Sequence, residues 1–456
     1  MSQTVLPNSI NYNEQLPSLS PGTQNYTQVL QPINGSTFGQ NQQIYIDIPS
    51  RGFIDPQSLY IRYKMNVTCQ TAAIAADAVA VIGCPVYTPF ARVETYINSQ
   101  QIDMVQDYNV VAHLWSNIFL GVNEKYGNQF GFGYNDTTPG TTSMDELDSR
   151  KLPAFAINAV NSYFVSGPLV CTKLAGCEKF IPAFATGGIR LVFTLDTIAN
   201  MLSATAAVFA NINVALTNIT NFEVVYDMID FGPEVERSIL SQPSIMIKAN
   251  GYSNSSTTLT AASQGLQTLV YNQRFASIRS AIVLPSGTSV NAVTLNGKFD
   301  SIDVTSGGYY SLNVGGVQFP QGGPINFSIN KAGAMSELRK ATGNLYDWSK
   351  SMSINNVEFS YTDVDVAYAA GTNTPATIAL TTTAQPGKVY VGFDLNKVNS
   401  ASRNMLNGTS SQNAPINLVL QIGTQMGAIA KNIYLVLNYD CVLILDPRTK
   451  MITLNQ

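Results

Sequence analysis

One strand-like phrase occurs twice in this chain, once in the middle and once near the end. Residues 222–233 read FEVVYDMIDFGP and residues 435–447 read LVLNYDCVLILDP. Each is an apolar run that contains Tyr-Asp and is followed by a proline, as expected for a strand that then breaks. Tyr226-Asp227 and Tyr439-Asp440 lie 213 positions apart in a chain of 456 residues. We therefore expect two copies of one β-domain, each closed by this strand.

Short alternating segments separated by turn residues fill both halves of the chain, a pattern typical of β-sandwiches or barrels. The segments expected to be strands are 42–49, 58–68, 160–170, 189–195 and 221–231 in the first half, and 244–249, 274–284, 357–368, 388–395, 416–422 and 432–446 in the second. Asn296-Gly297, within 291–304, is the strongest local hairpin signal.

Three segments have helical spacing instead. Residues 103–121 and 334–349 each carry one apolar face, and 233–243 begins with Pro233 and acidic residues. The two faces are Met104, Tyr108, Val111, Trp115 and Ile118, and Ala334, Leu338, Ala341, Leu345 and Trp348. The third segment lies between the two halves and is expected to be a connecting helix.

Further landmarks occur in the same order in both halves. Each helix ends near Trp-Ser, and Phe-x-Leu (Phe193/Leu195) or Phe-Asp-Leu (Phe393/Leu395) and then Asn-Met-Leu follow. The Trp-to-Phe separation is 78 positions in the first half and 45 in the second. We assign the excess to the loop 121–150 and predict that it projects as a surface tower or clasp. Its aromatics, Tyr126, Phe130, Phe132 and Tyr134, should then lie outside the sandwich core.

Charged residues are only 12% of the chain, about half the usual share of ~25%. Much of the surface must therefore be uncharged or covered by partners. The net charge is −4 without a Lys/Arg block, so direct nucleic-acid binding is not expected. Five irregularly spaced cysteines and a start without a signal-peptide pattern favour cytosolic synthesis with free thiols. The apolar stretches 71–86 and 197–216 are interrupted by polar residues and are not expected to span a membrane.

Catalytic chemistry has little support in the sequence. His113 is the single histidine, beside an apolar helix face, and is expected to be packed rather than to act as a base. Sequence motifs for a nucleophile elbow, a phosphate loop or a dinucleotide fold are absent. The pairs Gly307-Gly308 and Gly322-Gly323 indicate turns, and Asp300/Asp303 and Asp363/Asp365 indicate a solvated sheet edge more than a Ca²⁺ site. We predict no enzyme activity, no catalytic, cofactor-binding or metal-ligating residues, and no cofactor.

The Tyr-Asp pairs have a structural interpretation. Successive side chains of a strand point to opposite faces. Tyr226 and Tyr439 are therefore expected in the core, with Asp227 and Asp440 capping or pairing at the surface.

Together, the polar N-terminal segment, the repeated β-pattern, the connecting helix and the ending from KVYVGFDLNKVNSASRNML to NYDCVLILDP resemble a double jelly-roll major capsid protein. The similar family is that of virophages and polinton-like viruses, in the adenovirus-like lineage of eukaryotic double-stranded DNA viruses. The resemblance implies an all-β fold of two tandem eight-stranded jelly rolls with a few short helices in loops and between the domains. The expected parts are an extended arm (1–41), a first jelly roll (42–231), the connecting helix (232–243), a second jelly roll (244–447) and a tail (448–456).

The same resemblance implies a structural role in a virion. Three chains would form a pseudo-hexagonal capsomer, and capsomers would tile an icosahedral shell. The implied partners are further copies of the chain, minor capsid, penton and cement proteins, and an internal membrane reached by the arm. The alternative is a β-sandwich tail or adhesin protein that binds receptors or glycans through its loops. A hydrolase ranks third. The chain has only one histidine and no paired catalytic carboxylates, and both facts weaken this alternative.

Overall fold

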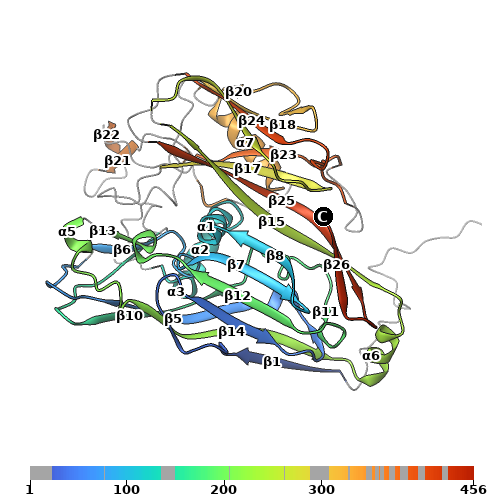
Figure 1. The fold of residues 1–456 in the computed structure, drawn as a ribbon. Helices are drawn as coiled ribbons and strands as arrows, with labels where there is room; N and C mark the ends of the chain where they lie inside the picture. Colours follow the sequence, from blue (N-terminus) through green and yellow to red (C-terminus); the bar gives the residue numbers. More distant parts are fainter. Residues whose placement is uncertain are drawn as a thin grey trace, which may run out of the picture.

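The computed structural model describes two β-sandwiches, the first below the second in Figure 1, joined by a helix at one side. The described residues are 23–76, 78–134, 149–204, 206–260, 262–287, 308–326, 329–345, 352–354, 359, 364–368, 375–380, 389–398, 406–423 and 430–456. The two hydrophobic interiors merge into one continuous cluster of buried residues. No helix in this described part is long and apolar enough to cross a membrane.

Eight principal strands build the first sandwich. They are β1 (Gln24–Leu30), β3 (Gln43–Ile48), β5 (Tyr60–Thr68), β7 (Phe90–Ile97), β8 (Gln100–Gln106), β10 (Val160–Pro168), β12 (Ile189–Leu195) and β14 (Asn218–Asp230). One sheet runs in the order β1–β14–β5–β10, and the other runs β3–β12–β7–β8. All of these pairings are antiparallel.

Eight principal strands also build the second sandwich. They are β15 (Ile245–Leu259), β16 (Gly265–Tyr271), β17 (Ile278–Gly287), β18 (Tyr309–Val314), β19 (Val317–Phe319), β23 (Val391–Asp394), β24 (Ile416–Ile422) and β25 (Lys431–Asp446). The sheets run β15–β25–β17–β23 and β16–β24–β18–β19. β25 has no exposed residue, as expected for a strand with neighbours on both of its edges.

Ranked along the chain, the principal strands of both domains pair in the same way. One sheet has the order first, eighth, third, sixth, and the other has second, seventh, fourth, fifth. This arrangement of eight strands in two sheets is the jelly roll. The predicted fold of two tandem jelly rolls is confirmed, and the Tyr-Asp phrase lies in the eighth strand of each domain.

Helices and shorter strands lie between or after the principal strands of the two jelly rolls. The helices are α1 (Tyr108–Ile118), α2 (Val122–Gly127), α3 (Gln129–Phe132), α4 (Ile198–Met201), α5 (Ala206–Phe209), α6 (Pro233–Leu240) and α7 (Lys331–Ala341), with 3-10 turns at Pro56–Ser58 and Ala183–Ala185. The additional strands are β2 (Thr37–Phe38), β4 (Phe53–Ile54), β6 (Val79–Ile82), β9 (Ser149–Lys151), β11 (Ile181–Pro182), β13 (Leu202–Ala204), β20 (Ile325–Asn326), β21 (Val364–Tyr368), β22 (Pro375–Leu380) and β26 (Met451–Asn455). α6 is the predicted connecting helix, with Pro233 in its first turn.

The first jelly roll begins earlier than its predicted boundary at residue 42. Residues 24–30, expected to belong to an arm, form β1 and pair with β14 over seven positions. β1 is an edge strand exposed along most of its length, so its sequence, QNYTQVL, lacks the apolar alternation of a buried strand. Residues 1–22 lie outside the described part of the chain.

Two helix predictions had the wrong bounds. Residues 103–106 belong to β8, and α1 begins at Tyr108 after Asp107, whose φ is 44°. Met104 is exposed on that strand, so its helical spacing from Tyr108 was coincidental. α7 ends at Ala341, and Gly343 with a φ of 78° follows it. Trp348 and the hairpin at 291–304 lie outside the described residues. The strand predicted at 244–249 is longer than expected, because β15 continues to Leu259.

The loop 121–150 was predicted to be extra length that the first domain has and the second lacks. This prediction is wrong. Phe193 lies in the seventh strand of its domain and Phe393 in the sixth, so these landmarks are not equivalent. Between the fifth and sixth strands, the first domain has 53 residues (107–159) and the second has 71 (320–390). Residues 122–127 and 129–132 are helical, and Phe132 is buried against Tyr87 at 6.2 Å. Tyr134 is buried as well, whereas Phe130 is exposed, and 135–148 lie outside the described residues.

Candidate assembly surfaces

The first surface to consider is the internal seam where the two domains meet. The loop after β10 runs beside β15 and extends its sheet by backbone hydrogen bonds. The N–H of Asn250 donates to the carbonyl of Gly176, and the N–H of Glu178 donates to the carbonyl of Lys248, both at 3.0 Å. Cys177 and Ala249 form the antiparallel bridge between these contacts. The seam therefore uses strand-edge pairing, which holds the loop after β10 in register with β15.

Buried charges lie in the same seam. Lys173, from the loop after β10, and Asp103, on β8, are each 3% exposed, and their charged groups lie 3.8 Å apart. The backbone N–H of Lys173 donates to Asp103 Oδ2 at 2.7 Å, and its Nζ donates to the carbonyl of Ile102 and to Gln456 Oε1. Burial raises the pKa of Asp103 to about 6, although the Lys173 charge acts to lower it. Gln456 follows β26, so the C-terminal segment completes this buried network.

The Tyr-Asp pairs contribute to the seam unequally. Both tyrosines are buried, as predicted. Asp227 is half-buried and accepts a hydrogen bond from Thr27 Oγ1 at 2.8 Å. Asp440, expected at the surface, is only 2% exposed, because Lys248 and Arg279 lie 3.6 and 3.9 Å from it and offset the loss of solvent. Lys248 also lies 3.5 Å from Glu178 of the first domain, so these charges cross the seam.

A glycine in the seam provides a direct test of its tightness. A Cβ at Gly176 would lie 2.1 Å from the carbonyl oxygen of Asn250, so Gly176→Ala must push the two domains apart. We expect a loss of about 1–3 kcal/mol, typical of overpacking, measured as the midpoint of urea unfolding. Gly39→Ala is the matched control, because its Cβ would meet nothing within 4 Å. An equal midpoint for both variants would contradict a tightly packed seam.

His113, the single histidine of the chain, is packed near the seam between the two domains, as predicted. It lies on α1 and is 1% exposed. Its Nε2 lies 3.1 Å from Asn117 Nδ2, and Asn117 in turn donates to the Tyr390 hydroxyl of the second domain at 2.9 Å. Lys125, also buried, donates to Asn117 Oδ1. This polar cluster ties helices α1 and α2 to the second sandwich and presents no open face to a substrate.

The remaining candidate chemistry is no better placed. Among the described residues, no three His, Cys, Asp or Glu side chains gather to hold a metal ion. Asp300, Asp303, Asp363 and Gly307 lie outside them. Gly308 approaches the backbone of Gln421 closely, and Gly323 has a φ of 103°, so both meet backbone requirements. All five cysteines are buried, and burial raises the thiol pKa of Cys171, Cys177 and Cys441, which suppresses their reactivity.

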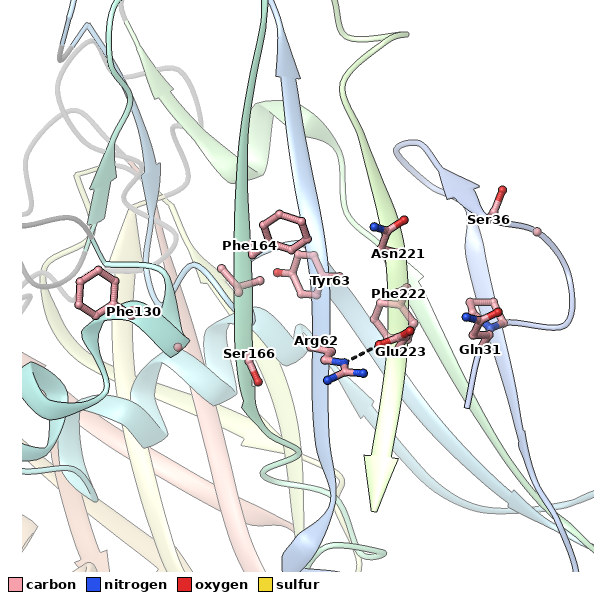
Figure 2. Close-up of a pocket in the computed structure, with 14 residues that line it drawn as sticks. Gln31, Ser36, Arg62, Tyr63, Phe130, Phe164, Ser166, Asn221, Phe222 and Glu223 are labelled. Carbon is pink, nitrogen blue, oxygen red and sulfur yellow. Dashed lines mark hydrogen bonds and ion pairs between the residues drawn. The ribbon is translucent and has the colours of Figure 1, made fainter. Parts of the chain in front are cut away.

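A groove crosses the outer face of the β1–β14–β5–β10 sheet. Figure 2 shows its aromatic side chains, Phe130 on α3 and Phe164 on β10, on one side, and Gln31 and Ser36 across from them. The groove encloses about 870 Å³. Phe130 is 94% and Phe164 is 64% exposed, and Lys64 Nζ lies 5.8 Å from the ring centre of Phe164. Two exposed aromatic rings that line one groove make this face a candidate contact site.

The floor of this groove includes an ion pair and a strand irregularity. Arg62 on β5 donates from Nε to Glu223 on β14, as the dashed line in Figure 2 marks. The register between these strands shifts between Thr220 and Glu223, and Asn221 adopts a φ of 52°. Such a bulge redirects side chains locally.

A second hollow, of about 670 Å³, lies on the outer face of the other sheet of the first domain. Asp47 on β3 accepts from Arg190 on β12 through two bonds of 2.6 and 2.9 Å. This hydrogen-bonded arginine lowers the pKa of Asp47. Arg92 and Glu94 on β7 lie 3.5 Å apart beside it. Because these charges are paired within the face, a partner could cover it without leaving an unpaired charge.

Solved structures share this architecture over nearly the whole chain. The Faustovirus major capsid protein matches with a TM-score of 0.60 at 9% identity, over 96% of this chain and 92% of its own. The mavirus major capsid protein matches with a TM-score of 0.57 at 13% identity, over 100% and 96%. A chain of the Sputnik virophage structure matches with a TM-score of 0.56 at 14% identity, over 100% and 93%.

These similarities establish the shared fold. The chain is a double jelly roll, the fold of the major capsid proteins it resembles. Neither a protein-family model nor a curated protein sequence matches it.

Proposed function

We propose that this double jelly-roll chain is the major capsid protein of a double-stranded DNA virus and forms homotrimeric, pseudo-hexagonal capsomers of an icosahedral shell. The observation that carries the proposal is the repetition of one strand order in two domains of one chain. A hexagonal lattice needs six similar edges, and three chains supply them only if each chain carries two similar domains.

Three other observations support a structural role. The chain has 12% charged residues, which suits large contact surfaces depleted of charge. The described polar clusters are buried in the domain seam and serve packing rather than catalysis. The two named capsid proteins share the fold over more than nine-tenths of their own lengths. We therefore assign the chain no enzymatic activity.

The proposal places the protein in the virion, after synthesis in the host cytosol. Its partners are its own copies within and between capsomers, together with minor capsid, penton and cement proteins. Residues 1–22, which precede β1, are the segment available to reach neighbouring capsomers or an internal membrane.

The second candidate function, receptor or glycan binding, is favoured by the groove of Figure 2. Exposed aromatic rings beside polar side chains are suited to stacking on a sugar ring while hydroxyl groups are hydrogen-bonded. Under this alternative, Phe130→Ser combined with Phe164→Ser should abolish glycan binding and leave the chain folded, because both side chains are exposed.

Negative-stain electron microscopy of the purified chain tests the proposed function. We expect uniform particles with hexagonal outlines, each formed by three chains. Monodisperse single chains that bind glycans would favour the second candidate instead.

A further inference from the structure

The seam inside one chain has a defined geometry at its central residue, Asn250 on β15. Its partner on the neighbouring strand β25, Asp440, directs its own N–H away from β15, to the carbonyl of Ser277 at 2.9 Å. The backbone groups of Asn250 are therefore turned outward, and its N–H donates to Gly176 of the first domain.

β1 is the equivalent strand of the first domain, and the repeated Tyr-Asp phrase fixes the register. Thr27 pairs with Asp227 of the first Tyr-Asp phrase, just as Asn250 pairs with Asp440 of the second. Asp227 directs its N–H to Ser58 Oγ at 2.8 Å and its carbonyl to the N–H of Asp55 at 3.1 Å, both away from β1. The N–H and carbonyl of Thr27 are therefore turned to the opposite edge of β1, as those of Asn250 are.

Within the described part of the chain, that edge of β1 has no strand partner. The other edge pairs with β14. β1 lies at the outer margin of the first domain (Figure 1). Edge strands are usually protected by charges, prolines or bulges, and QNYTQVL has none of these. Tyr26 and Val29 on this strand are exposed.

In the first domain, β8 and the loop after β10 face β15. The second domain has an equivalent of each of these two elements. β19 has the rank of β8, and the loop after β23 has the rank of the loop after β10. These loops contain 21 residues (395–415) and 20 residues (169–188) before the seventh strand. On this side of the second domain, Val317, Val398 and Leu406 are exposed apolar side chains.

We propose that the open edge of β1 binds the second domain of another copy of this chain, at β19 and the described parts of the loop after β23. In this contact the outward-facing backbone N–H of Thr27 donates to the partner copy, as the N–H of Asn250 donates to Gly176 within the chain. The inference rests on the proposed trimer and specifies its interface. The contact joins two different surfaces, so repeating it closes into a ring when the rotation between copies closes, as the proposed trimer requires. Three seams within chains and three between them close a ring of six domains.

The first test uses proline at the outward-facing position. Thr27→Pro removes an N–H that faces the partner copy and leaves the ladder to β14 intact, because proline is tolerated on an edge. Each contact between two chains loses one hydrogen bond, which weakens that contact about tenfold. We therefore expect trimers to dissociate at higher protein concentrations than wild-type trimers do, measured by sedimentation velocity. Thr27→Ala is the matched control: it also loses the hydroxyl bond to Asp227 but keeps the N–H, so its trimers should persist.

The second test is cross-linking. A chain carrying Tyr26→Cys and Leu406→Cys should yield covalent dimers and trimers with a short bismaleimide, whereas each single variant should not. The five native cysteines are buried and should not react under native conditions. Trimers that form normally but neither cross-link nor respond to Thr27→Pro would overturn this seam and leave the proposed function standing. A wild-type chain that stays monomeric would overturn both.

Discussion

Replacing Lys173 with alanine is expected to lower the free energy of unfolding by about 3–5 kcal/mol, because it leaves a buried carboxylate without its partner. Lys173 and Asp103 are both nearly inaccessible, and their contact lies between the two sandwiches. The loss also removes the bonds from Nζ to Ile102 and Gln456. Urea unfolding followed by circular dichroism measures the change. Arg62→Ala, which breaks the more exposed pair with Glu223, is the control and should cost less than about 1 kcal/mol.

The cost of Lys173→Ala should depend on pH. Asp103 has a folded-state pKa of about 6, above the unfolded value of about 3.9, so the folded protein binds this proton more readily. The contribution of this group to stability therefore increases as pH falls through 6 toward 4. A protonated Asp103 no longer requires a cation, so the difference between variant and wild type should shrink below about pH 6. A difference that is small at pH 7.5, or that grows on acidification, would contradict this account of the seam.

Deleting residues 1–30 is expected to destabilise the first domain by roughly 3–6 kcal/mol, since the ladder from β1 to β14 spans seven paired positions. Leu30, which packs against the core, and the bond from Thr27 to Asp227 are lost with it. Thermal unfolding measures the effect. Deletion of residues 1–22 is the matched control, because it leaves β1 and its ladder to β14 in place. Equal melting of both truncated chains would show that β1 contributes little to the fold.

Much of the fold could be predicted from the sequence, because alternation and the Tyr-Asp phrase report local burial. The bounds of β12 and β24 were predicted without error, and the two domains have the predicted strand architecture. β1 was missed because an edge strand buries little and needs no apolar alternation. Phe193 and Phe393 were matched wrongly because Phe-x-Leu fits any half-buried strand, whereas only pairing reveals strand rank.

The seam could not be predicted from the sequence. Asp103 and Lys173 are 70 positions apart in unrelated segments, and Gln456 joins them from the end of the chain. A lysine or an aspartate is normally exposed, so its burial becomes visible only when two domains cover it. The one available signal was Asp440 in the repeated phrase, flanked on both sides by residues of a buried strand. Phe132 was likewise misplaced, since glycines beside it suggested a projecting loop rather than a helix against β10.

The central claim is that two equivalent domains in one chain exist to build a homotrimer. Sedimentation equilibrium of the full chain at micromolar concentration tests this most directly. The account predicts a single species with three times the chain mass of 49.2 kDa, stabilised by an interface of more than ~2,000 Å². A single species at the mass of one chain, unchanged up to high concentration, would contradict it.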